Sequence, residues 1–170
     1  MNLYLRLLLL FIKSAWKPKL DITDKSVLTF RVLVNDLDIN MHMNNGRFNS
    51  IMDLGRVEIM QRTGLLKLVH SKGWFGVVGT IHTHFRRPLK LFQAYELHSQ
   101  VIYWDEKWTW IEHKMFSRDK LICHALVQTL IRGKSENIPN AQLQKLMGHN
   151  ISSPPITADI AHLESFGTSS

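Results

Sequence analysis

The stretch that decides the fold is residues 36–48, DLDINMHMNNGRF. Its first ten residues hold two carboxylates, one imidazole and three amides, and they follow an apolar segment. So many polar groups at the end of an apolar strand are costly unless water solvates them or a function uses them. Two interpretations are open. The stretch is either a functional site or an ordinary turn, because Asn45-Gly46 is also a hairpin signal and clusters of Asp and Asn are common in turns.

The residues after this stretch predict a long helix over 46–63. Its apolar positions recur at spacings of three and four, which is the period of a helix with one buried face. They are Phe48, Ile51, Met52, Gly55, Ile59 and Met60. Asn44 or Asn45 is a suitable N-cap and Gly64 a suitable stop, so the helix would be about 27 Å long. This period argues against a hairpin, because these residues do not alternate.

Two features inside the predicted helix concern packing. Asp53 with Arg56, and Glu58 with Arg62, have the spacing of surface ion pairs. Gly55 lowers the stability of a helix interior relative to alanine. It is therefore either simply tolerated there or needed for the close approach of another element.

A carboxylate next to a helix start has a definite chemistry. The first turn of a helix offers unpaired N–H groups and a partial positive charge, which polarise a carbonyl group. A nearby carboxylate such as Asp38 can act on that carbonyl as a general base or as a nucleophile. Acyl transfer needs both parts, and a thioester is a suitable target because its thiolate leaves without a strong acid.

The rest of the chain reads mainly as strands. Segments rich in β-branched and aromatic residues, separated by turn residues, predict them. They are 26–34, 74–85, 95–104, 108–116 and 121–131. Tight turns at Asp105-Glu106-Lys107 and Arg118-Asp119-Lys120 imply antiparallel pairing. One long helix can cover the apolar face of such a curved sheet, so we predict an α+β fold with about five antiparallel strands around one helix.

The N-terminal residues are the most hydrophobic part of the chain. Residues 1–12, MNLYLRLLLLFI, are too short to cross a bilayer, which takes about 20 residues, and Arg6 interrupts them. No basic residue precedes the apolar run, which argues against a signal peptide. We predict a helix that either packs on the domain or on a partner subunit, or lies on a membrane with Arg6, Lys13, Lys17 and Lys19 toward anionic headgroups.

Length and composition indicate one domain. Lys17-Pro18-Lys19 breaks the N-terminal helix, so we divide the chain into a hydrophobic helix over 1–16, a domain over 17–149 and a loose, flexible tail over 150–170. A short helix is expected over 141–147. The single cysteine, Cys123, lies in the most apolar strand, which indicates a packing role and favours a reducing compartment such as the cytoplasm.

The net charge of +7 suits a polyanion, whether nucleic acid, anionic lipid or the phosphates of CoA. The basic residues are scattered and no nucleic-acid-binding motif is present, so no nucleic acid is expected as a partner. His82 and His84 share a strand face, but no third ligand accompanies them, so no metal site is expected.

The string DLDINMHMNNGRF resembles the D-x-D-x-x-G-H-(V/M)-N-N-x-x-(Y/F) signature of the 4-hydroxybenzoyl-CoA thioesterase-like branch of the hotdog superfamily. The resemblance covers residues 25–133 and includes Phe85-Arg86-Arg87-Pro88, similar to the family's aromatic-x-x-Pro strand. HMNNGRF with MDLGR and the hydrophobic N-terminus is most similar to the thioesterase-superfamily-member-6-like subgroup. Two positions differ from the usual residues of the signature: Met41 stands in place of the usual Gly, and Phe48 in place of the more usual Tyr.

The resemblance implies a hotdog fold, dimerisation through the sheets and an active site at the subunit interface. Asp38 matches the catalytic Asp, as general base on water or as nucleophile, and Asp36 is expected to stabilise the loop. The other implied catalytic residues are His42 and Asn44. The expected substrate-binding residues are Asn45, Gly46 and Phe48 near the helix start, with Gly79 and Thr80 expected, from their position, to face the site from the partner strand. Arg86 and Arg87 are candidates for the CoA phosphates, because guanidinium groups match phosphate oxygens.

We therefore predict an acyl-CoA thioesterase that releases a carboxylic acid and free CoA, with CoA required only as part of the substrate. The predicted assembly is a homodimer or a dimer of dimers, and the predicted location is cytoplasmic, with peripheral membrane contact through residues 1–16 as one option. The alternative is a non-catalytic acyl-thioester-binding or scaffold protein of the same fold at a membrane surface. A hotdog dehydratase or isomerase is disfavoured, because such enzymes usually carry a catalytic histidine on the helix and residues 47–63 contain none.

Overall fold

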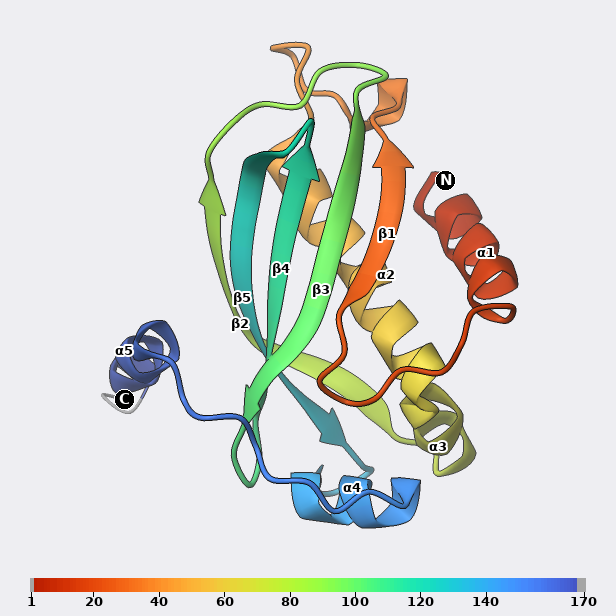
Figure 1. Ribbon diagram of the computed structural model, residues 1–170, viewed down its shortest axis with the longest axis vertical. Coiled ribbons are helices and arrows are strands. Elements are labelled where there is room, and N and C mark those ends of the chain that lie inside the picture. Colours follow the sequence, from red (N-terminus) through yellow and green to blue (C-terminus); the bar gives the residue numbers. More distant parts are fainter. Residues whose placement is uncertain (1, 168–170) are drawn as a thin grey trace.

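The computed structural model describes residues 2–167, and its centre is one antiparallel sheet that curls around a long helix (Figure 1). The strands follow the order β1-β3-β4-β5-β2, with β6 paired to β5. Their bounds are β1 Ser26–Arg31, β2 Phe75–Phe85, β3 Ala94–Trp104, β4 Thr109–Ser117, β5 Lys120–Arg132 and β6 Asn137–Ile138. The helices are α1 Asn2–Ser14, α2 Asn45–Thr63, α3 Leu65–Ser71, α4 Asn140–Met147 and α5 Ala158–Gly167, with a 3₁₀ turn η1 at Val34–Asp36.

The predicted long helix is confirmed as α2. The Asn44 side chain caps it by accepting a hydrogen bond of 2.8 Å from the Gly46 N–H. Gly64 ends it in the left-handed conformation, with a φ of 84°, which glycine adopts without steric cost. No strand pairing occurs at Asn45-Gly46, so the hairpin interpretation is wrong.

The main core lies between α2 and the concave face of the sheet. Large side chains of α2 and the inward residues of β3 and β4 meet there. They include Phe48, Ile51, Met52, Tyr95, Leu97 and Met115, which are almost fully buried. Gly55 faces this interface, because a Cβ atom at that position would come within 2.9 Å of Leu97 Cδ2 and would overlap Ser99 Oγ. The close-approach interpretation of Gly55 is therefore confirmed.

A buried chain of polar side chains crosses the same interface. Arg56 on α2 pairs with exposed Asp53 and lies 3.3 Å from His113 Nε2 on β4. The other ring nitrogen of His113 is 2.8 Å from Ser99 Oγ. Burial lowers the pKa of Arg56 to about 10. Burial, and secondarily the Arg56 charge, holds the pKa of His113 well below its ordinary value, so this histidine is neutral in the folded protein.

We expect His113 to make the protein less stable in mild acid. The unfolded chain regains the ordinary pKa of 6.5, so below that pH it binds a proton that the folded chain does not. Stability is therefore lost as the pH falls below 6.5, by up to about 1.4 kcal/mol per pH unit. Urea unfolding at about pH 7.5 and 5.5 measures this loss, and His113→Gln should reduce it. Exposed His70→Gln is the control, and an equal loss in both variants would contradict the assignment.

The N-terminal helix packs on the domain, which confirms one of its two interpretations. In Figure 1 α1 lies beside β1 and α2. Leu10 is buried in the main core, and Leu3 and Leu7 pack against it. Two of the basic residues expected at headgroups point inward instead: Arg6 is buried, and Lys17 Nζ lies 2.7 Å from Glu58 Oε1. Of the helices described, none combines the length and the apolar character needed to cross a membrane.

The prediction of a loose tail is wrong for residues 158–167, which form α5. Ile160 of α5 is fully buried against Trp110 and Leu126, on the face of the sheet away from α2. Trp110 Nε1 donates a hydrogen bond of 3.0 Å to Glu164. Apolar contacts with the sheet thus order a segment whose composition suggested a coil, although 150–157 has no regular secondary structure and 168–170 lie outside the described residues.

Two further expectations need correction. The first strand ends at Arg31 rather than at residue 34, because the chain turns into η1 so that Asp36 can reach the interior. Glu58 and Arg62 do not form a surface pair, because Glu58 is fully buried and is approached by both Arg62 and Lys17. The predicted Asp53–Arg56 pair is confirmed.

Candidate active site

The loop between η1 and α2 holds Asp38 in a compact turn. The Asp38 N–H donates to the His42 carbonyl at 2.9 Å, and the Met41 N–H donates to the Asp38 carbonyl at 3.1 Å. One carboxylate oxygen of Asp38, Oδ1, accepts from the N–H groups of Asn40 at 2.9 Å and His42 at 3.4 Å. Bridges pair Leu37 with Met43 and His42 with Lys90. The half-buried carboxylate is thereby held by its own loop, seven residues before Asn45, the first residue of α2.

Asp36 stabilises the loop that carries Asp38, as predicted. Its side chain is fully buried and lies between two guanidinium groups, those of Arg6 and Arg47. Its carbonyl accepts a hydrogen bond of 2.9 Å from the N–H of Asn44. Asp36 therefore connects the loop directly to the start of α2.

The predicted residues at the helix start are in place and solvent-exposed. Asn44 is the N-cap, and Asn45 and Gly46 are the first two residues of α2. The Gly46 N–H is already satisfied by the Asn44 side chain at 2.8 Å. The start of α2 thus presents its partial positive charge at the same end of the molecule as Asp38.

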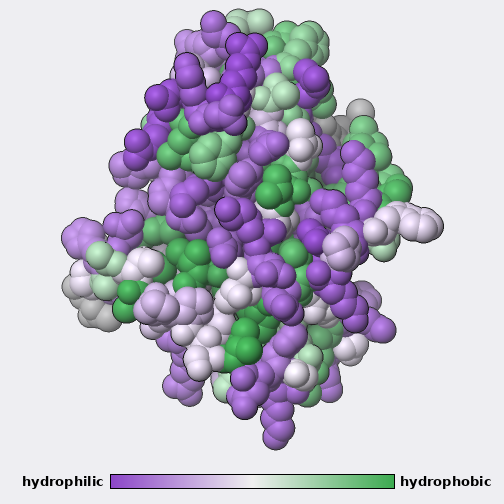
Figure 2. Space-filling model, in the orientation of Figure 1, coloured by the Kyte–Doolittle hydropathy of each residue, from purple (hydrophilic) through white to green (hydrophobic). Residues whose placement is uncertain are grey.

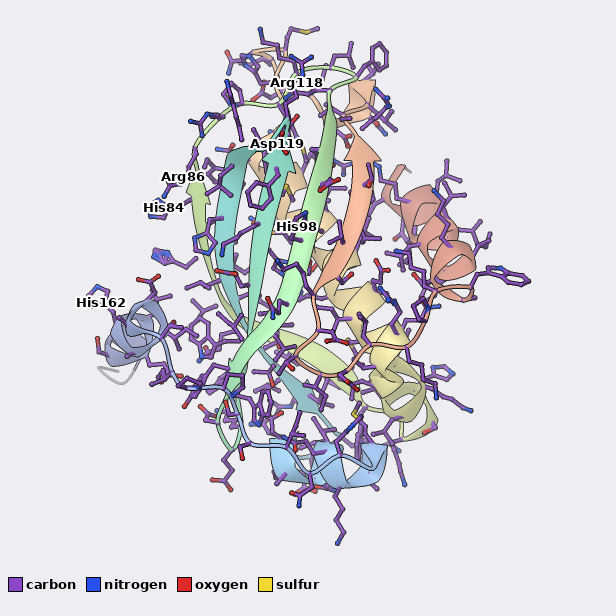
Figure 3. All side chains as sticks on the ribbon, in the orientation of Figure 1. His84, Arg86, His98, Arg118, Asp119 and His162 are labelled. Atoms are coloured by element: carbon purple, nitrogen blue, oxygen red, sulfur yellow. The ribbon has the colours of Figure 1, made fainter. Side chains whose placement is uncertain are left out.

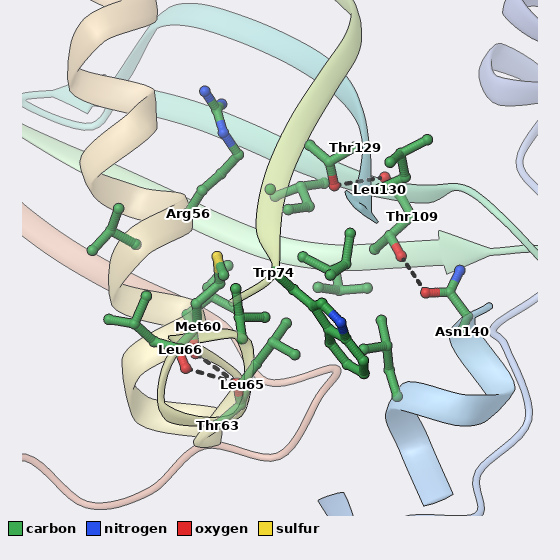
Figure 4. Close-up of a pocket in the computed structure, with 18 of the residues that line it drawn as sticks. Arg56, Met60, Thr63, Leu65, Leu66, Trp74, Thr109, Thr129, Leu130 and Asn140 are labelled. Carbon is green, nitrogen blue, oxygen red and sulfur yellow. Dashed lines mark hydrogen bonds between the residues drawn. The ribbon is translucent and has the colours of Figure 1, made fainter. Parts of the chain in front are cut away.

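A large apolar pocket of about 550 Å³ lies toward the other end of α2 (Figure 4). The second half of α2, together with α3, α4 and the strand ends, surrounds it. Trp74, Leu65, Met60, Leu130 and Leu143 are among its apolar lining residues, and Asp53 and Arg56 also border it. A hydrogen bond of 3.1 Å from Thr109 to Asn140 fixes α4 to the sheet at its rim. Local sequence patterns do not predict this pocket, because its walls come from helices and strands that lie far apart in the sequence.

The structure places Phe48 away from the solvent. Phe48 is 2% exposed, and its ring meets that of Phe85 edge-on at 5.3 Å. Phe48, which stands where the signature usually has Tyr, is therefore part of the hydrophobic core that supports the first turn of α2.

Gly79 and Thr80 lie in the middle of β2, where the pairing with β5 is irregular. A Cβ atom at Gly79 would come within 2.7 Å of the Trp108 ring, so only glycine leaves room for this indole. Both residues are exposed. Neither is brought next to Asp38 of the same chain by a hydrogen bond.

Arg86 and Arg87 follow β2 directly. In Figure 3 Arg86 and His84 project outward from β2. Arg87 Nη1 donates a hydrogen bond of 2.7 Å to the Leu121 carbonyl, which fixes this side chain to the start of β5. Arg86 is thus the freer of the two guanidinium groups.

Strand β2 forms an edge of the sheet with an unpaired side. Among the described strands it pairs only with β5. Phe75, Val78, Ile81 and Phe85 are large apolar residues exposed along it. Its first residues border the pocket, and its last residues reach the start of α2 through the hydrogen bond from Thr83 to Asn49, of 3.3 Å.

Residues 32–146 match the model of the thioesterase-like superfamily, which is more than half of the chain. The chain belongs to this superfamily. It is also 30% identical over 163 residues to protein THEM6 of Danio rerio, covering 89% of this chain and 79% of that protein. Membership of the thioesterase-like superfamily makes the chain a thioester hydrolase.

Solved structures confirm the hotdog fold. The probable thioesterase YbaW of Escherichia coli superposes with a TM-score of 0.65 at 17% identity, covering 71% of this chain and 96% of that one. The protein SAV2348 of Staphylococcus aureus, solved in complex with CoA, superposes with a TM-score of 0.64 at 18% identity, covering 82% and 92%.

The departure of this thioesterase-like chain at Met41 has a visible consequence. Met41 has a φ of 59°, in the left-handed region where glycine is favoured. The signature's glycine suits this backbone, and the methionine that replaces it is held there by the turn, with its side chain 63% exposed. The loop thus keeps the conformation that the signature predicts, at a cost of about 1 kcal/mol.

Cys123 has the packing role that was predicted. Its side chain is fully buried in the main core. Burial raises the pKa of its thiol to about 12, so the thiol stays protonated at neutral pH and is a poor nucleophile.

Proposed function

We propose that the protein hydrolyses acyl-CoA thioesters and that the Asp38 carboxylate carries the reaction. The observation that supports this is the position of Asp38, in a turn held by its own loop N–H groups at the end of the molecule where α2 begins. A carbonyl placed there meets both a carboxylate and the positive end of a helix.

Two courses of reaction fit this arrangement. As a general base, Asp38 takes a proton from water, the oxygen attacks the carbonyl carbon, and the C–S bond breaks to release a carboxylic acid and CoA thiol. As a nucleophile, the carboxylate displaces the thiolate and forms an acyl anhydride, which water then hydrolyses. In both courses the thiolate takes up the proton and Asp38 returns to its charged form.

We further propose that two copies pair through β2. An edge strand of eleven residues with exposed apolar side chains is a ready template for another strand. In an antiparallel pair related by a two-fold axis, the end of one β2 lies beside the start of the other. The start of β2 borders the pocket, and its end lies at the start of α2. Such a dimer brings Asp38 of one protomer toward the pocket of its partner.

This arrangement suggests what the pocket binds. Its volume of about 550 Å³ lies within the usual range of small-molecule sites, and its walls are mainly aliphatic and aromatic. We propose that it takes an aliphatic acyl chain whose thioester reaches the partner's Asp38. Arg86, exposed at the end of β2, is the candidate for a CoA phosphate, because guanidinium groups match phosphate oxygens.

The test is the release of free thiol from a panel of short, medium, long and aromatic acyl-CoAs. We expect turnover, with kcat/KM highest for aliphatic chains that fill the pocket. Met60→Trp, which narrows the pocket, should raise KM for the long chains and leave the short ones nearly unchanged. Tight binding of acyl-CoA without thiol release from any substrate would instead support the binding or scaffold protein.

We also propose that the protein acts in the cytoplasm at a membrane surface, through the outer face of α1. Leu5, Leu8, Leu9, Ile12 and Trp16 are exposed at helical spacing, and Trp16 is 88% exposed. Figure 2 shows hydrophobic residues of α1 on the surface at the edge of the view. Lys13 and Lys19 are exposed nearby, which suits an anionic lipid surface.

Vesicle pelleting checks the membrane proposal. We expect the protein to pellet with vesicles of phosphatidylcholine and phosphatidylserine, and less with phosphatidylcholine alone. A variant with Leu5→Ser, Leu8→Ser and Ile12→Ser should remain in the supernatant, because it loses apolar area on the exposed face only. Equal pelleting of this variant would show that α1 does not contact lipid.

A further inference from the structure

Arg6 is a charged residue on the buried side of the otherwise apolar helix α1. Its side chain is 8% exposed, and its guanidinium carbon lies 5.8 Å from the centre of the Phe30 ring. Nη2 donates to Asp36 Oδ2 at 2.6 Å and to the Arg31 carbonyl at 2.9 Å, and Nη1 donates to Asp36 Oδ1 at 3.3 Å. Helix α1 is thus tied to the end of β1 and to the loop that follows it.

Asp36 also accepts hydrogen bonds from three other residues. Arg47, in the first turn of α2, donates to Oδ1 from Nε at 3.2 Å and from Nη2 at 3.0 Å. The Leu33 N–H donates to Oδ2 at 2.9 Å, and the Asn44 N–H donates to the Asp36 carbonyl. One buried residue therefore joins α1, β1 and α2 at the base of the loop that carries Asp38 two residues later.

The two guanidinium groups connect Asp36 to different elements of the fold. Arg47 ties Asp36 to α2, and Arg6 ties it to α1 and β1. Without Arg6 the carboxylate keeps its hydrogen bonds from Arg47 and from the Leu33 N–H, but it loses both hydrogen bonds from α1 and the link that Arg6 makes to the Arg31 carbonyl. A shift of about 1 Å in a catalytic group can cost on the order of 100-fold in rate.

We propose that Arg6 is a positioning residue for the hydrolysis, so that α1 forms part of the scaffold of the active site. Arg6 precedes the segment 32–146 that matches the superfamily, and it acts through Asp36 without touching the substrate. This inference rests on the proposed role of Asp38. It assigns to the inner face of α1 a task that is separate from the lipid contact proposed for its outer face.

The test compares Arg6→Met, Arg6→Lys and Arg62→Met. Arg62 is the matched control, because it ties the segment after α1 to α2 through the Pro18 carbonyl at 3.0 Å and does not contact the catalytic loop. We expect Arg6→Met to lower kcat by about 10- to 100-fold with KM changed less than about twofold. Arg6→Lys should restore part of kcat, because its ammonium keeps the charge but not the paired geometry. Arg62→Met should keep the wild-type kcat.

Hydrogen exchange provides a readout that does not depend on turnover. Arg6→Met should speed the exchange of the Asp38 and Met43 N–H groups, while β4 and β5 stay as protected as in the wild type. If wild type releases no thiol, the proposed function fails and exchange alone decides the role of Arg6. Faster loop exchange supports the inference, and unchanged exchange in a folded variant overturns it. An unchanged kcat for Arg6→Met in an active enzyme also overturns it.

Discussion

Asp38→Asn should reduce thiol release from acyl-CoA by about 10²- to 10⁴-fold, which is the usual contribution of a positioned general base. Asparagine keeps an oxygen that can accept the hydrogen bonds from the Asn40 and His42 N–H groups, so the turn should persist. The change removes only the negative charge and the basic oxygen. Steady-state kinetics on the best acyl-CoA, with unfolding curves to show equal stability, measures the effect.

Asp119→Asn is the control for this loss. Asp119 is exposed in the β4–β5 turn, and its φ of 60° is one that asparagine also tolerates. It should keep full activity. Wild-type activity in Asp38→Asn would remove Asp38 from the mechanism.

A mixing experiment tests where the two parts of the site lie. Asp38→Asn lacks the carboxylate and Met60→Trp has a narrowed pocket, so each should be poor on a long-chain acyl-CoA. If the site combines Asp38 of one protomer with the pocket of the partner, reassembly of an equal mixture restores about a quarter of the sites. If both parts come from one protomer, mixing restores none.

Gly55→Val should lower the free energy of unfolding by about 3 kcal/mol, the upper part of the usual range for overpacked cores. The new Cβ atom would overlap Ser99 Oγ and approach Leu97 Cδ2 to 2.9 Å, and Ser99 is held in place by His113. The β-strand carrying both residues lies across α2, so the helix must move outward. Urea unfolding measures the loss, which corresponds to about 6–12 °C in Tm.

Gly55→Ala separates two opposing effects at the same position. Alanine is favoured over glycine in a helix interior by about 1 kcal/mol, whereas the close contact with Ser99 opposes it. We expect a net loss smaller than that of Gly55→Val. Gly76→Val is the control, because nothing lies within 4 Å of a Cβ atom there and valine suits a strand. A stabilised Gly55→Ala would show that α2 and β3 can separate enough to admit a Cβ atom at this position.

Much of the fold was predictable from local patterns. The apolar period from Phe48 onward, the cap at Asn44 and the stop at Gly64 specify α2 to within one residue. Turn residues around 105–107 and 118–120 place β3, β4 and β5 in antiparallel succession. These signals are carried by neighbouring residues, because helix periods, caps and turns depend on interactions over a few positions.

Other features could not be read from neighbours. Composition predicts a flexible tail over 150–170, yet residues 158–167 form α5, and Ile160 is buried against Trp110, fifty positions earlier in the chain. Arg6 looked like a headgroup contact, yet it pairs with Asp36, thirty positions later. In both cases a distant apolar surface or charge outweighs the local preference, and the local sequence does not contain that partner.

The sequence by itself determined the helix that follows the polar stretch, the antiparallel strands and the position of Asp38 between them. It did so because the residues that specify each of these lie side by side in the chain. Only the tertiary structure decided that Asp36, in the loop that carries Asp38, links α1, β1 and α2. It also decided that Gly55 leaves room for the Ser99 side chain, and that an apolar pocket lies toward the C-terminal end of α2. Those features arise where segments far apart in the sequence meet. A charge becomes buried, and a close contact or a pocket forms, only after the chain has brought those segments together.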